Sequence, residues 1–289
     1  MIKNILKWQG GKSELMDSIK TYLPPELFDI EENITAIDAF CGGGSVFMFF
    51  LNNCPGIKRL IINDYNSRLI RLYYDIKEQP QELINQLDIL QTKYNTAIDK
   101  SKVYYEWRDK YNKSVNSLFT SALLLCLNRT CFNGLYRENS KGLFNASWGK
   151  KDTLNYTEDF IRDISSKLNS ITIYFISGDF SITQNYITEN NTFIYLDPPY
   201  RPLTGSNSFT NYVSSPFNDN SQIRLKVFCD DAIKYFNSKV MVSNSYDPND
   251  NFLINLYKGY NIRQIIATRK SGGKGAMRGN IRENLITNY

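Results

Sequence analysis

Histidine is absent from the 289 residues, and cysteine is scarce. The absence of histidine excludes serine-histidine-aspartate triads, H-E-x-x-H zinc motifs and histidine general bases. The five cysteines form no C-x-x-C pair, which argues against a zinc site and a disulfide framework and favours the reducing cytosol. We therefore expect a cytoplasmic protein that uses no metal. Its chemistry would depend on carboxylates, aromatic rings, backbone groups or a cofactor.

Long apolar runs are also missing. The most apolar stretch, residues 121–127, is far too short to span a bilayer, and residues 1–7 lack the apolar core and the cleavage site of a signal peptide. We therefore expect no membrane partner. The length and ordinary composition allow a sizeable core in one large or two small domains.

Basic residues are concentrated in two stretches of the chain. Residues 100–151 hold ten Lys or Arg against three Asp or Glu, and residues 258–282 hold seven against none, although the net charge is only +5. This distribution suits a face that binds phosphates, so we expect nucleic acid as a partner. Two solvated surface segments are the alternative explanation.

Short apolar runs alternate with amphipathic stretches, which predicts an α/β fold. The predicted strands are residues 34–38, 59–62, 171–176, 192–196, 240–242, 262–268 and 283–287. The predicted helices are residues 45–51, 67–76, 81–98, 115–128 and 221–236. This alternation implies a mainly parallel sheet with helices on both faces.

The block of residues 69–155 is helical and basic, shows no clear strand, and looks inserted between the second and third strands. We therefore divide the chain into two predicted domains. Residues 1–68 and 156–289 would form the catalytic domain, and residues 69–155 a helical domain that recognises the target.

A glycine-rich turn follows the first predicted strand, in Asp38-Ala-Phe-Cys-Gly-Gly-Gly-Ser45. Glycines let a ligand approach the backbone, and a helix N-terminus favours an anionic group. Asp64 ends the second strand, where an acidic side chain can bind ribose hydroxyls. The pattern indicates a nucleoside-containing cofactor, although Phe47 occupies the last glycine position of G-x-G-x-x-G. A tight turn and a helix N-cap at Asp64 are the structural alternatives.

The sequence Asp197-Pro198-Pro199-Tyr200 directly follows the predicted strand 192–196. An aromatic amino group is a poor nucleophile because its lone pair is delocalised into the ring. A carboxylate and a backbone carbonyl can accept its two hydrogens and hold the nitrogen closer to tetrahedral. Two prolines stiffen such a turn, and a tyrosine can stack on the base. These four residues are therefore the predicted catalytic group of an in-line methyl transfer, which needs neither metal nor histidine.

Taken together, the motifs resemble those of the Dam-type DNA adenine methyltransferases, which are alpha-class D-P-P-Y amino-methyltransferases. They are Lys7-Trp-Gln-Gly-Gly-Lys12, Asp38-Ala-Phe-Cys-Gly-Gly-Gly44, Asn63-Asp-Tyr-Asn66, Asn128-Arg-Thr-Cys-Phe-Asn-Gly-Leu-Tyr-Arg137, Gly178-Asp-Phe180 and Asp197-Pro-Pro-Tyr200. Residues 271–289 are similar too, so the resemblance covers nearly the whole chain. It implies a Rossmann-like methyltransferase sheet, S-adenosylmethionine as the cofactor, and methyl transfer to N6 of adenine in double-stranded DNA.

The resemblance also implies roles for single residues. Asp64 would hold the cofactor ribose, and Asp179 and Phe180 would bracket the cofactor adenine. Asp197 and the adjacent proline would bind the target amino group, while Tyr200 stacks on the flipped base. Trp8, Lys12, Phe40 and the glycine turn would contact the methionine end. The full set of cofactor-binding residues is Trp8, Lys12, Asp38, Phe40, Gly42, Gly43, Gly44, Ser45, Asp64, Asp179, Phe180 and Asp197.

The target amino group is stacked inside the duplex, so the base must be flipped into the pocket. By resemblance, the segment 128–137 inserts into DNA, Phe132 wedges beside the flipped base, and Leu135 and Arg137 read bases. Arginine is the usual bidentate reader of guanine. A helix end with Gly134 as the stop signal is the structural alternative. The predicted DNA-binding residues are Lys7, Asn128, Arg129, Phe132, Asn133, Leu135, Arg137, Asn139 and, as phosphate contacts, Arg269, Lys270, Lys274 and Arg278.

The residue after Arg137 departs from the pattern. Glu138 could read cytosine or face water, so the recognition sequence stays open beyond a GATC-like palindrome. We further expect a monomer, encoded by a bacterium or a phage, that acts alone or beside a separate cognate restriction endonuclease.

Other functions remain alternatives. A catalytically inactive homologue would bind DNA only, but the intact D-P-P-Y motif and Asp64 argue against it. A methyltransferase of cytosine N4 or of RNA fits the D-P-P-Y form and the 128–137 segment less well. A nicotinamide-dependent dehydrogenase would give that segment no role.

Overall fold

The computed structural model describes residues 5–8, 10–201, 217–268 and 280–289. Its strands there are β1 (Ile34–Asp38), β2 (Ile57–Asp64), β3 (Thr172–Ser177), β4 (Thr192–Leu196), β5 (Lys239–Ser245), β6 (Asn261–Thr268) and β7 (Asn280–Thr287). The α-helices are α1 (Met16–Lys20), α2 (Ser45–Asn53), α3 (Ser67–Glu78), α4 (Pro80–Thr96), α5 (Lys100–Lys113), α6 (Leu118–Thr130), α7 (Glu158–Leu168), α8 (Asp219–Phe236) and α9 (Phe252–Leu256). The short 3-10 helices are η1 (Lys12–Glu14), η2 (Pro25–Phe28), η3 (Phe132–Gly134) and η4 (Phe180–Tyr186).

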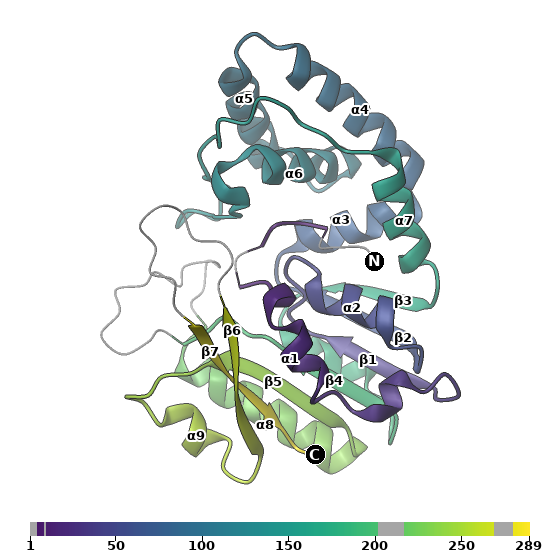
Figure 1. Ribbon diagram of the computed structural model, residues 1–289, viewed down its shortest axis with the longest axis vertical. Helices are drawn as coiled ribbons and strands as arrows, with labels where there is room; N and C mark the ends of the chain where they lie inside the picture. The colour runs from purple at the N-terminus through teal and green to yellow at the C-terminus, as the bar shows by residue number, and fades with distance from the viewer. Residues whose placement is uncertain (1–4, 9, 202–216, 269–279) are drawn as a thin grey trace.

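The described strands form one mixed sheet in the order β3-β2-β1-β4-β5-β7-β6. Neighbours from β3 to β5 are parallel, whereas β7 is antiparallel to both β5 and β6. The chain therefore runs outward from β1 to β3 and returns to the other side of β1 with β4 (Figure 1). Open α/β sheets bind ligands at the carboxyl ends of strands where the order reverses in this way. Asp38 and Asp197 both lie at that point, and the predicted, mainly parallel sheet is confirmed.

Side chains of the central strands alternate between two buried clusters. Every residue of β1 and β4 is buried. Ala36 and Phe193 belong to one cluster and Ile37 and Ile194 to the other, because successive strand residues point to opposite faces. Helices α2, α3 and α7 cover the first face, and α8 with η4 covers the second. This double cover explains why the two strands read as continuous apolar runs.

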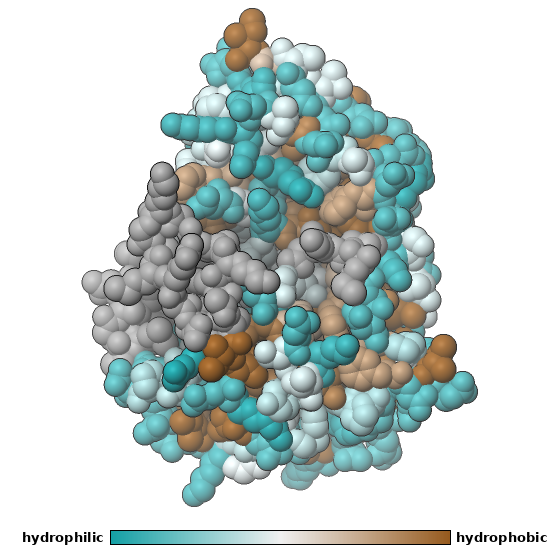
Figure 2. Space-filling view, viewed as in Figure 1, coloured by the Kyte–Doolittle hydropathy of each residue, from teal (hydrophilic) through white to brown (hydrophobic). Residues whose placement is uncertain are grey.

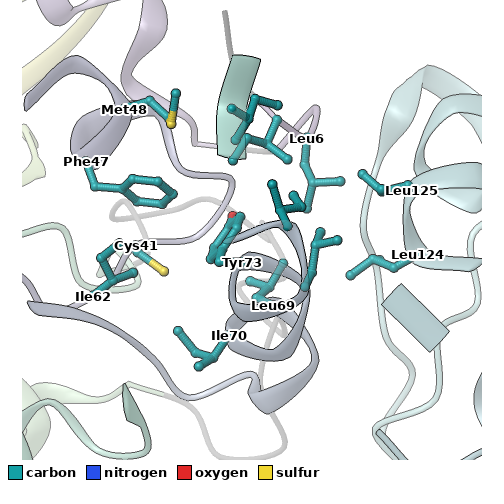
Figure 3. Close-up of a cluster of buried hydrophobic side chains, with 14 of the residues drawn as sticks. Leu6, Cys41, Phe47, Met48, Ile62, Leu69, Ile70, Tyr73, Leu124 and Leu125 are labelled. Atoms are coloured by element: carbon teal, nitrogen blue, oxygen red, sulfur yellow. The ribbon is translucent and has the colours of Figure 1, made fainter. Parts of the chain in front are cut away.

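Helices α4, α5 and α6 form a layer above the sheet, with α3 and α7 at the junction (Figure 1). Figure 3 shows Leu69 and Tyr73 of α3 between Phe47 of α2 and the pair Leu124 and Leu125 of α6. One buried cluster thus continues from the sheet into the helical layer. The predicted boundary after residue 68 falls inside α3, which packs on both parts, so the two-domain division stays a proposal.

Helix α7 was not predicted, although its sequence carries the necessary signals. Thr157 caps the first turn by accepting a hydrogen bond from the backbone of Phe160, and Ile161, Ile164 and Leu168 face the core at helical spacing. Other predicted bounds differ from the observed ones by a few residues. The helix expected at 115–128, for example, begins only at Leu118 as α6, because the preceding serine forms a capping box.

The face shown in Figure 2 is mostly hydrophilic over the helical layer. None of the helices in the described ranges is both long and apolar enough to cross a membrane.

Candidate active site

The glycine turn is tied to the end of β2 by Asp64. The Asp64 carboxylate accepts hydrogen bonds from the backbone N–H groups of Gly42 at 2.9 Å and Asn66 at 2.8 Å. The N-cap of α3 is Asn66, whose side chain accepts from the N–H of Arg68. The alternative that Asp64 is this N-cap is therefore wrong, although Asp64 does order the backbone that precedes the helix.

Trp8 lies directly on the glycine turn. A Cβ atom added to Gly43 would lie 2.4 Å from the Cβ atom of Trp8, so only glycine fits at this position. The indole also stacks on the ring of Tyr136, with centroids 4.7 Å apart and 24° between the planes. Trp8 therefore joins the candidate cofactor turn to the candidate DNA-binding segment, and at least one glycine serves this packing.

Lys12 is buried and forms an ion pair with Asp197, whose side chain is 18% exposed. Nζ of Lys12 lies 2.7 Å from Oδ2 of Asp197, and Lys12 is 1% exposed. The ammonium also donates to the carbonyl of Gly10 at 2.9 Å, while the backbone N–H of Lys12 donates to Oγ of Ser45 at 3.1 Å. The first motif, the glycine turn and the D-P-P-Y motif thus meet. Lys12 was expected at the methionine end of the cofactor, and its pairing with Asp197 was not predicted.

The D-P-P-Y turn is held by α8 and the end of β5. Gln222 donates to the carbonyl of Pro199 at 3.4 Å and accepts from Asn244 at 3.1 Å. Ser245 donates to the carbonyl of Arg201 at 3.2 Å. Pro198 is buried within this support. The predicted catalytic turn is therefore backed by packed regular structure.

Tyr200 is anchored through its hydroxyl. This group donates to Oε2 of Glu283 at 2.6 Å and lies 3.2 Å from Oγ of Ser243. The ammonium of Lys12 is 4.9 Å from the ring centroid. Glu283 and Ser243 were not predicted as site residues. They are brought together by the antiparallel pairing of β5 and β7, which no local sequence motif predicts.

Carboxylates crowd the ends of β1, β2 and β4. Burial, together with the charges of Asp197 and Asp64, raises the pKa of Asp38 well above its ordinary value. Burial also raises the pKa of Asp64, and it raises that of Asp197 to about 6 although Lys12 opposes the shift. The backbone N–H groups of Phe40 and Phe47 partly oppose the rise in the pKa of Asp38, and no side chain in the described ranges donates a hydrogen bond to its carboxylate. The site is therefore electrostatically suited to a ligand that carries positive charge.

Asp179 and Phe180, which were predicted to bind the cofactor adenine, both contact other side chains in the structure. Phe180 is buried, with its ring centroid 5.6 Å from that of Phe40 and 5.6 Å from that of Phe228. Asp179 caps η4 and binds the guanidinium of Arg224 at 2.8 Å. The structure thus brings Phe40 and Phe180 together as a wall, and their contact with a cofactor stays a proposal.

The segment after α6 presents exposed side chains next to Lys7. Phe132 is 55% exposed, and Asn133 is also exposed. Asn133 and Gly134 both have positive φ angles, 54° and 68°, so the chain reverses direction here. A Cβ atom on Gly134 would lie 2.5 Å from Cδ of Lys7. The structure therefore brings Lys7 to the loop that carries Phe132 and Leu135.

Asn128 and Arg129 have partners within the protein. The buried amide of Asn128 accepts from the N–H of Lys7 at 2.9 Å and donates to the carbonyls of Lys7 at 2.8 Å and Gly134 at 3.1 Å. Both amide hydrogens are thus used in positioning Lys7 and the loop, and contact of Asn128 with DNA stays a proposal that these bonds do not support. The guanidinium of Arg129 lies over the rings of Tyr156 and Phe160, at 4.9 and 5.5 Å. These ring contacts give Arg129 an internal packing role as well.

Residues 137–145 form a small hairpin. Asn145 donates its backbone N–H to the carbonyl of Arg137. The side chain of Asn139 caps the turn by accepting from the N–H groups of Lys141 and Leu143. The exposed Arg137 donates Nε–H to Oδ1 of Asn145 at 2.8 Å. The hairpin thus presents Arg137 at the surface, with Asn139 stabilising the turn.

Glu138 is partly buried and is hydrogen-bonded within the protein. Its Oε1 accepts a hydrogen bond of 2.6 Å from the hydroxyl of Tyr136, which in turn accepts from Asn66 at 3.0 Å. Burial raises the pKa of Glu138. The hydrogen bond occupies one carboxylate oxygen of Glu138, and a role in reading cytosine stays a proposal.

Four predicted phosphate contacts, Arg269, Lys270, Lys274 and Arg278, lie outside the described residues, as does Gln9 of the first motif. Among the residues that are described, no three acidic or cysteine side chains are grouped as metal ligands would be.

Comparisons with known proteins agree with the geometry of the site. Residues 8–271 match the family model described as D12 class N6 adenine-specific DNA methyltransferase. Over its full length the chain is 38% identical to the Type II methyltransferase M.MjaIII of Methanocaldococcus jannaschii, of which 99% is covered. It is 35% identical, again over its full length, to the Type II methyltransferase M1.LlaDCHI of Lactococcus lactis subsp. cremoris, of which 96% is covered. The DNA adenine methylase of Vibrio cholerae is 30% identical over 96% of this chain and 93% of its own length.

These matches confirm the expected resemblance, the Rossmann-like methyltransferase fold and the adenine-specific activity. The sheet order, the D-P-P-Y turn at its reversal point and the full-length similarity to named methylases lead to one conclusion. The chain belongs to the D12 class of N6-adenine-specific DNA methyltransferases.

Proposed function

We propose that this methyltransferase uses S-adenosylmethionine to methylate adenine within a short GATC-like palindrome, after flipping the base out of the duplex. The observation that carries the proposal is the position of the Asp197–Tyr200 turn. It follows β4 at the reversal of strand order and meets the glycine turn through Lys12.

The charges of the site fit this cofactor. Asp38, Asp64 and Asp197 have raised pKa values, so a cation among them is favoured electrostatically. S-adenosylmethionine carries a sulfonium and an ammonium group, and when bound it supplies an electrophilic methyl group. We assign its ribose to Asp64 and its adenine to the region of Phe180. Tyr65, 60% exposed and adjacent to Asp64, is a further candidate for stacking on the purine, which sequence analysis did not include.

Asp197 and the carbonyl of Pro198 would act on the target amino group. Both accept hydrogen bonds from its N–H groups, which directs the nitrogen lone pair away from the ring and toward the methyl group. The nitrogen gains a methyl group and must lose one proton. Asp197, with a pKa of about 6, is suited to take that proton and pass it to water.

The loop after α6 supplies side chains for base flipping and base reading. The exposed ring of Phe132 is suited to fill the space that a flipped base leaves. Arg137 on its hairpin and Lys7 beside Gly134 are the proposed guanine readers, and Leu135 lies between them in the chain. Two guanine readers are consistent with a GATC-like palindrome.

The biological setting is proposed from the relatives. Two of the relatives named above are called Type II methyltransferases, and they come from an archaeon and a bacterium. We propose a monomeric enzyme that works either alone or next to a separate restriction endonuclease. Bacterial or phage origin and a cytoplasmic location are part of the same proposal.

The test is expression in a methylation-free host, followed by sequencing that locates modified adenines at single-base resolution. We expect methylated adenine in one short palindrome. Unmodified adenine in cells that contain the soluble protein would refute the proposal. Mass analysis of digested nucleosides would reveal N4-methylcytosine or methylated RNA if either rival substrate were the true one.

Asp197→Ala provides the matched variant. It should abolish transfer of a labelled methyl group while duplex DNA is still bound, because Asp197 acts on the amino group and not on phosphates. Wild-type protein that binds DNA and transfers no methyl group would instead indicate an inactive homologue. Binding of a nicotinamide cofactor would favour the dehydrogenase alternative.

A further inference from the structure

A buried acidic residue that no motif marks lies behind the catalytic turn. Glu283 of β7 is 6% exposed, and its Oε2 accepts hydrogen bonds from Tyr200 at 2.6 Å and from Ser243 at 2.9 Å. The same oxygen lies 3.8 Å from the ammonium of Lys12, whose closer partner is Asp197 at 2.7 Å. Glu283 therefore contacts Tyr200 directly and reaches Asp197 through a shared cation.

We propose that Glu283 is a positioning residue of the methyl-transfer reaction. It fixes the ring of Tyr200 against the target base and keeps the buried charges around Lys12 net negative. This inference rests on the roles proposed above for Asp197 and Tyr200, and it concerns a residue outside every motif of the chain.

The geometry supports the first part of the proposal. The phenol oxygen of Tyr200 is held by Glu283 and Ser243, and the Lys12 ammonium lies 4.9 Å from the ring centroid. Glu283 pairs with Ser245 in the antiparallel ladder between β7 and β5, so its backbone is fixed by the sheet. Sites built on strands hold a side chain more accurately than loops do. A displaced ring would matter, because a misplacement of about 1 Å can cost roughly 100-fold in rate.

The charges support the second part. Lys12 offsets the charge of Asp197, and Glu283 adds one further negative charge at 3.8 Å from the same ammonium. The target nitrogen becomes positive as its bond to the methyl carbon forms and the methyl–sulfur bond breaks, until one proton leaves. Because the cluster is buried, an excess negative charge interacts with the developing cation more strongly than in water. Glu283 would thus favour the transition state over the bound ground state.

Several groups face Asp197, and each bears on its titration. In the described ranges they are Lys12 of η1, Asp38 of β1, Tyr195 of β4, Tyr200 of the catalytic turn and Glu283 of β7. Burial and the charge of Glu283 raise the pKa of Asp197, and Lys12 lowers it. Removing the charge of Glu283 should therefore lower the pKa of Asp197. A role confined to holding β7 in place would leave this titration unchanged.

The experiment compares wild type, Glu283→Gln, Tyr200→Phe and the double variant, by steady-state and single-turnover methyl transfer from labelled cofactor to a duplex oligonucleotide as a function of pH. Glutamine keeps an acceptor for the tyrosine and loses the charge. We expect kcat of Glu283→Gln to fall about tenfold or more with a much smaller change in KM. We also expect the acid limb of its pH profile to move to lower pH. Tyr200→Phe should lose rate, and the double variant should lose little more.

Glu26→Gln is the matched control. Glu26 of η2 pairs with Lys239 at the start of β5, whereas Glu283 lies beside Ser245 at the end of that strand, so this variant removes a glutamate–lysine contact away from the site. It should retain the wild-type rate and acid limb.

Wild-type kcat together with an unmoved acid limb in Glu283→Gln would overturn the proposal. If that variant fails to fold, Tyr200→Phe decides the matter: a wild-type rate there overturns the anchoring role, whereas a reduced rate supports it. Absence of methyl transfer by the wild-type enzyme would refute the function proposed above and not this inference alone.

Discussion

Asp197 links the pH dependence of catalysis to burial. Burial raises its pKa to about 6, Lys12 opposes the shift, and Glu283 adds to it. The carboxyl group must be ionised to take the proton that the methylated amino group loses. We therefore expect the single-turnover rate to rise as pH increases through about 6 and then to level off. A rate that stays flat from about pH 5 to about pH 8 would contradict this assignment.

The raised pKa of Asp197 also makes the stability of the fold depend on pH, and here a rise in pH lowers stability while it increases the rate of catalysis. The folded pKa of Asp197 lies above its model value of 3.8, so its contribution to folding is largest below that value. This contribution is lost as pH rises through about 6. The ionised carboxylate that catalysis needs is therefore a cost to the folded state, as expected where function sets the charge.

Arg137 is the residue whose loss should change sequence preference. Replacing it with alanine removes the proposed bidentate contact with guanine, so discrimination at one base pair should fall by about 1–3 kcal/mol. Binding and transfer on oligonucleotides with single base-pair changes would measure the effect. Lys141→Ala is the matched control, because Lys141 is an exposed basic residue of the same hairpin. A uniform loss across all sequences would make Arg137 a phosphate contact.

At the level of the secondary-structure elements, the strands and turns that were predicted are those whose own residues carry a signal. The strand 34–38, the strand 192–196 and the D-P-P-Y turn that follows were predicted because each is a continuous stretch with its own signal. The buried role of Asn128 was not predicted. It stands in a motif with DNA-binding residues, and only the contacts to Lys7 and Gly134 show that its amide is occupied.

Other parts of the site could not be predicted for a related reason. Glu283 acquires its place through the β5–β7 ladder, and Lys12 meets Asp197 through tertiary folding. The family resemblance supplied roles for motif residues and was silent about these supports. The sequence therefore marked the motif residues of the proposed site and gave no signal for the contacts that orient them.

Gly43 tests whether the glycine turn is shaped by Trp8. The Cβ atom of Gly43→Ala would meet that of Trp8 at 2.4 Å, so the turn or the indole must shift. We expect weaker cofactor binding and a lower melting temperature, measured by calorimetry and thermal unfolding. Gly259→Ala is the control: its φ of 94° strains any side chain, but no atom lies within 4 Å. Unchanged cofactor affinity in Gly43→Ala would show that the turn tolerates the shift.

Across the whole molecule, the basic stretch of residues 100–151 lies in the helical layer and the loop that follows it. Binding of many phosphates releases counterions, so affinity for nonspecific duplex DNA should fall steeply with salt. The slope of log K against log salt concentration should be about −0.9 for each phosphate contacted. Filter binding or fluorescence anisotropy over a salt series would measure it, and a flat response would contradict a phosphate-binding face.

The core that α3 shares with α6 limits how a protein of this kind can acquire a new target. Tyr73 of α3 donates a hydrogen bond to the carbonyl of Gly42, while Leu69 of the same helix contacts the helical layer. A chimera that takes its whole helical layer from a relative would change the neighbours of the helix that supports the glycine turn. Drift in specificity is therefore expected through point substitutions of exposed residues in the loop and hairpin, such as Phe132, Asn133 and Arg137, whose side chains can change without repacking the core. Exchange of whole helical layers as cassettes should be rare in this lineage.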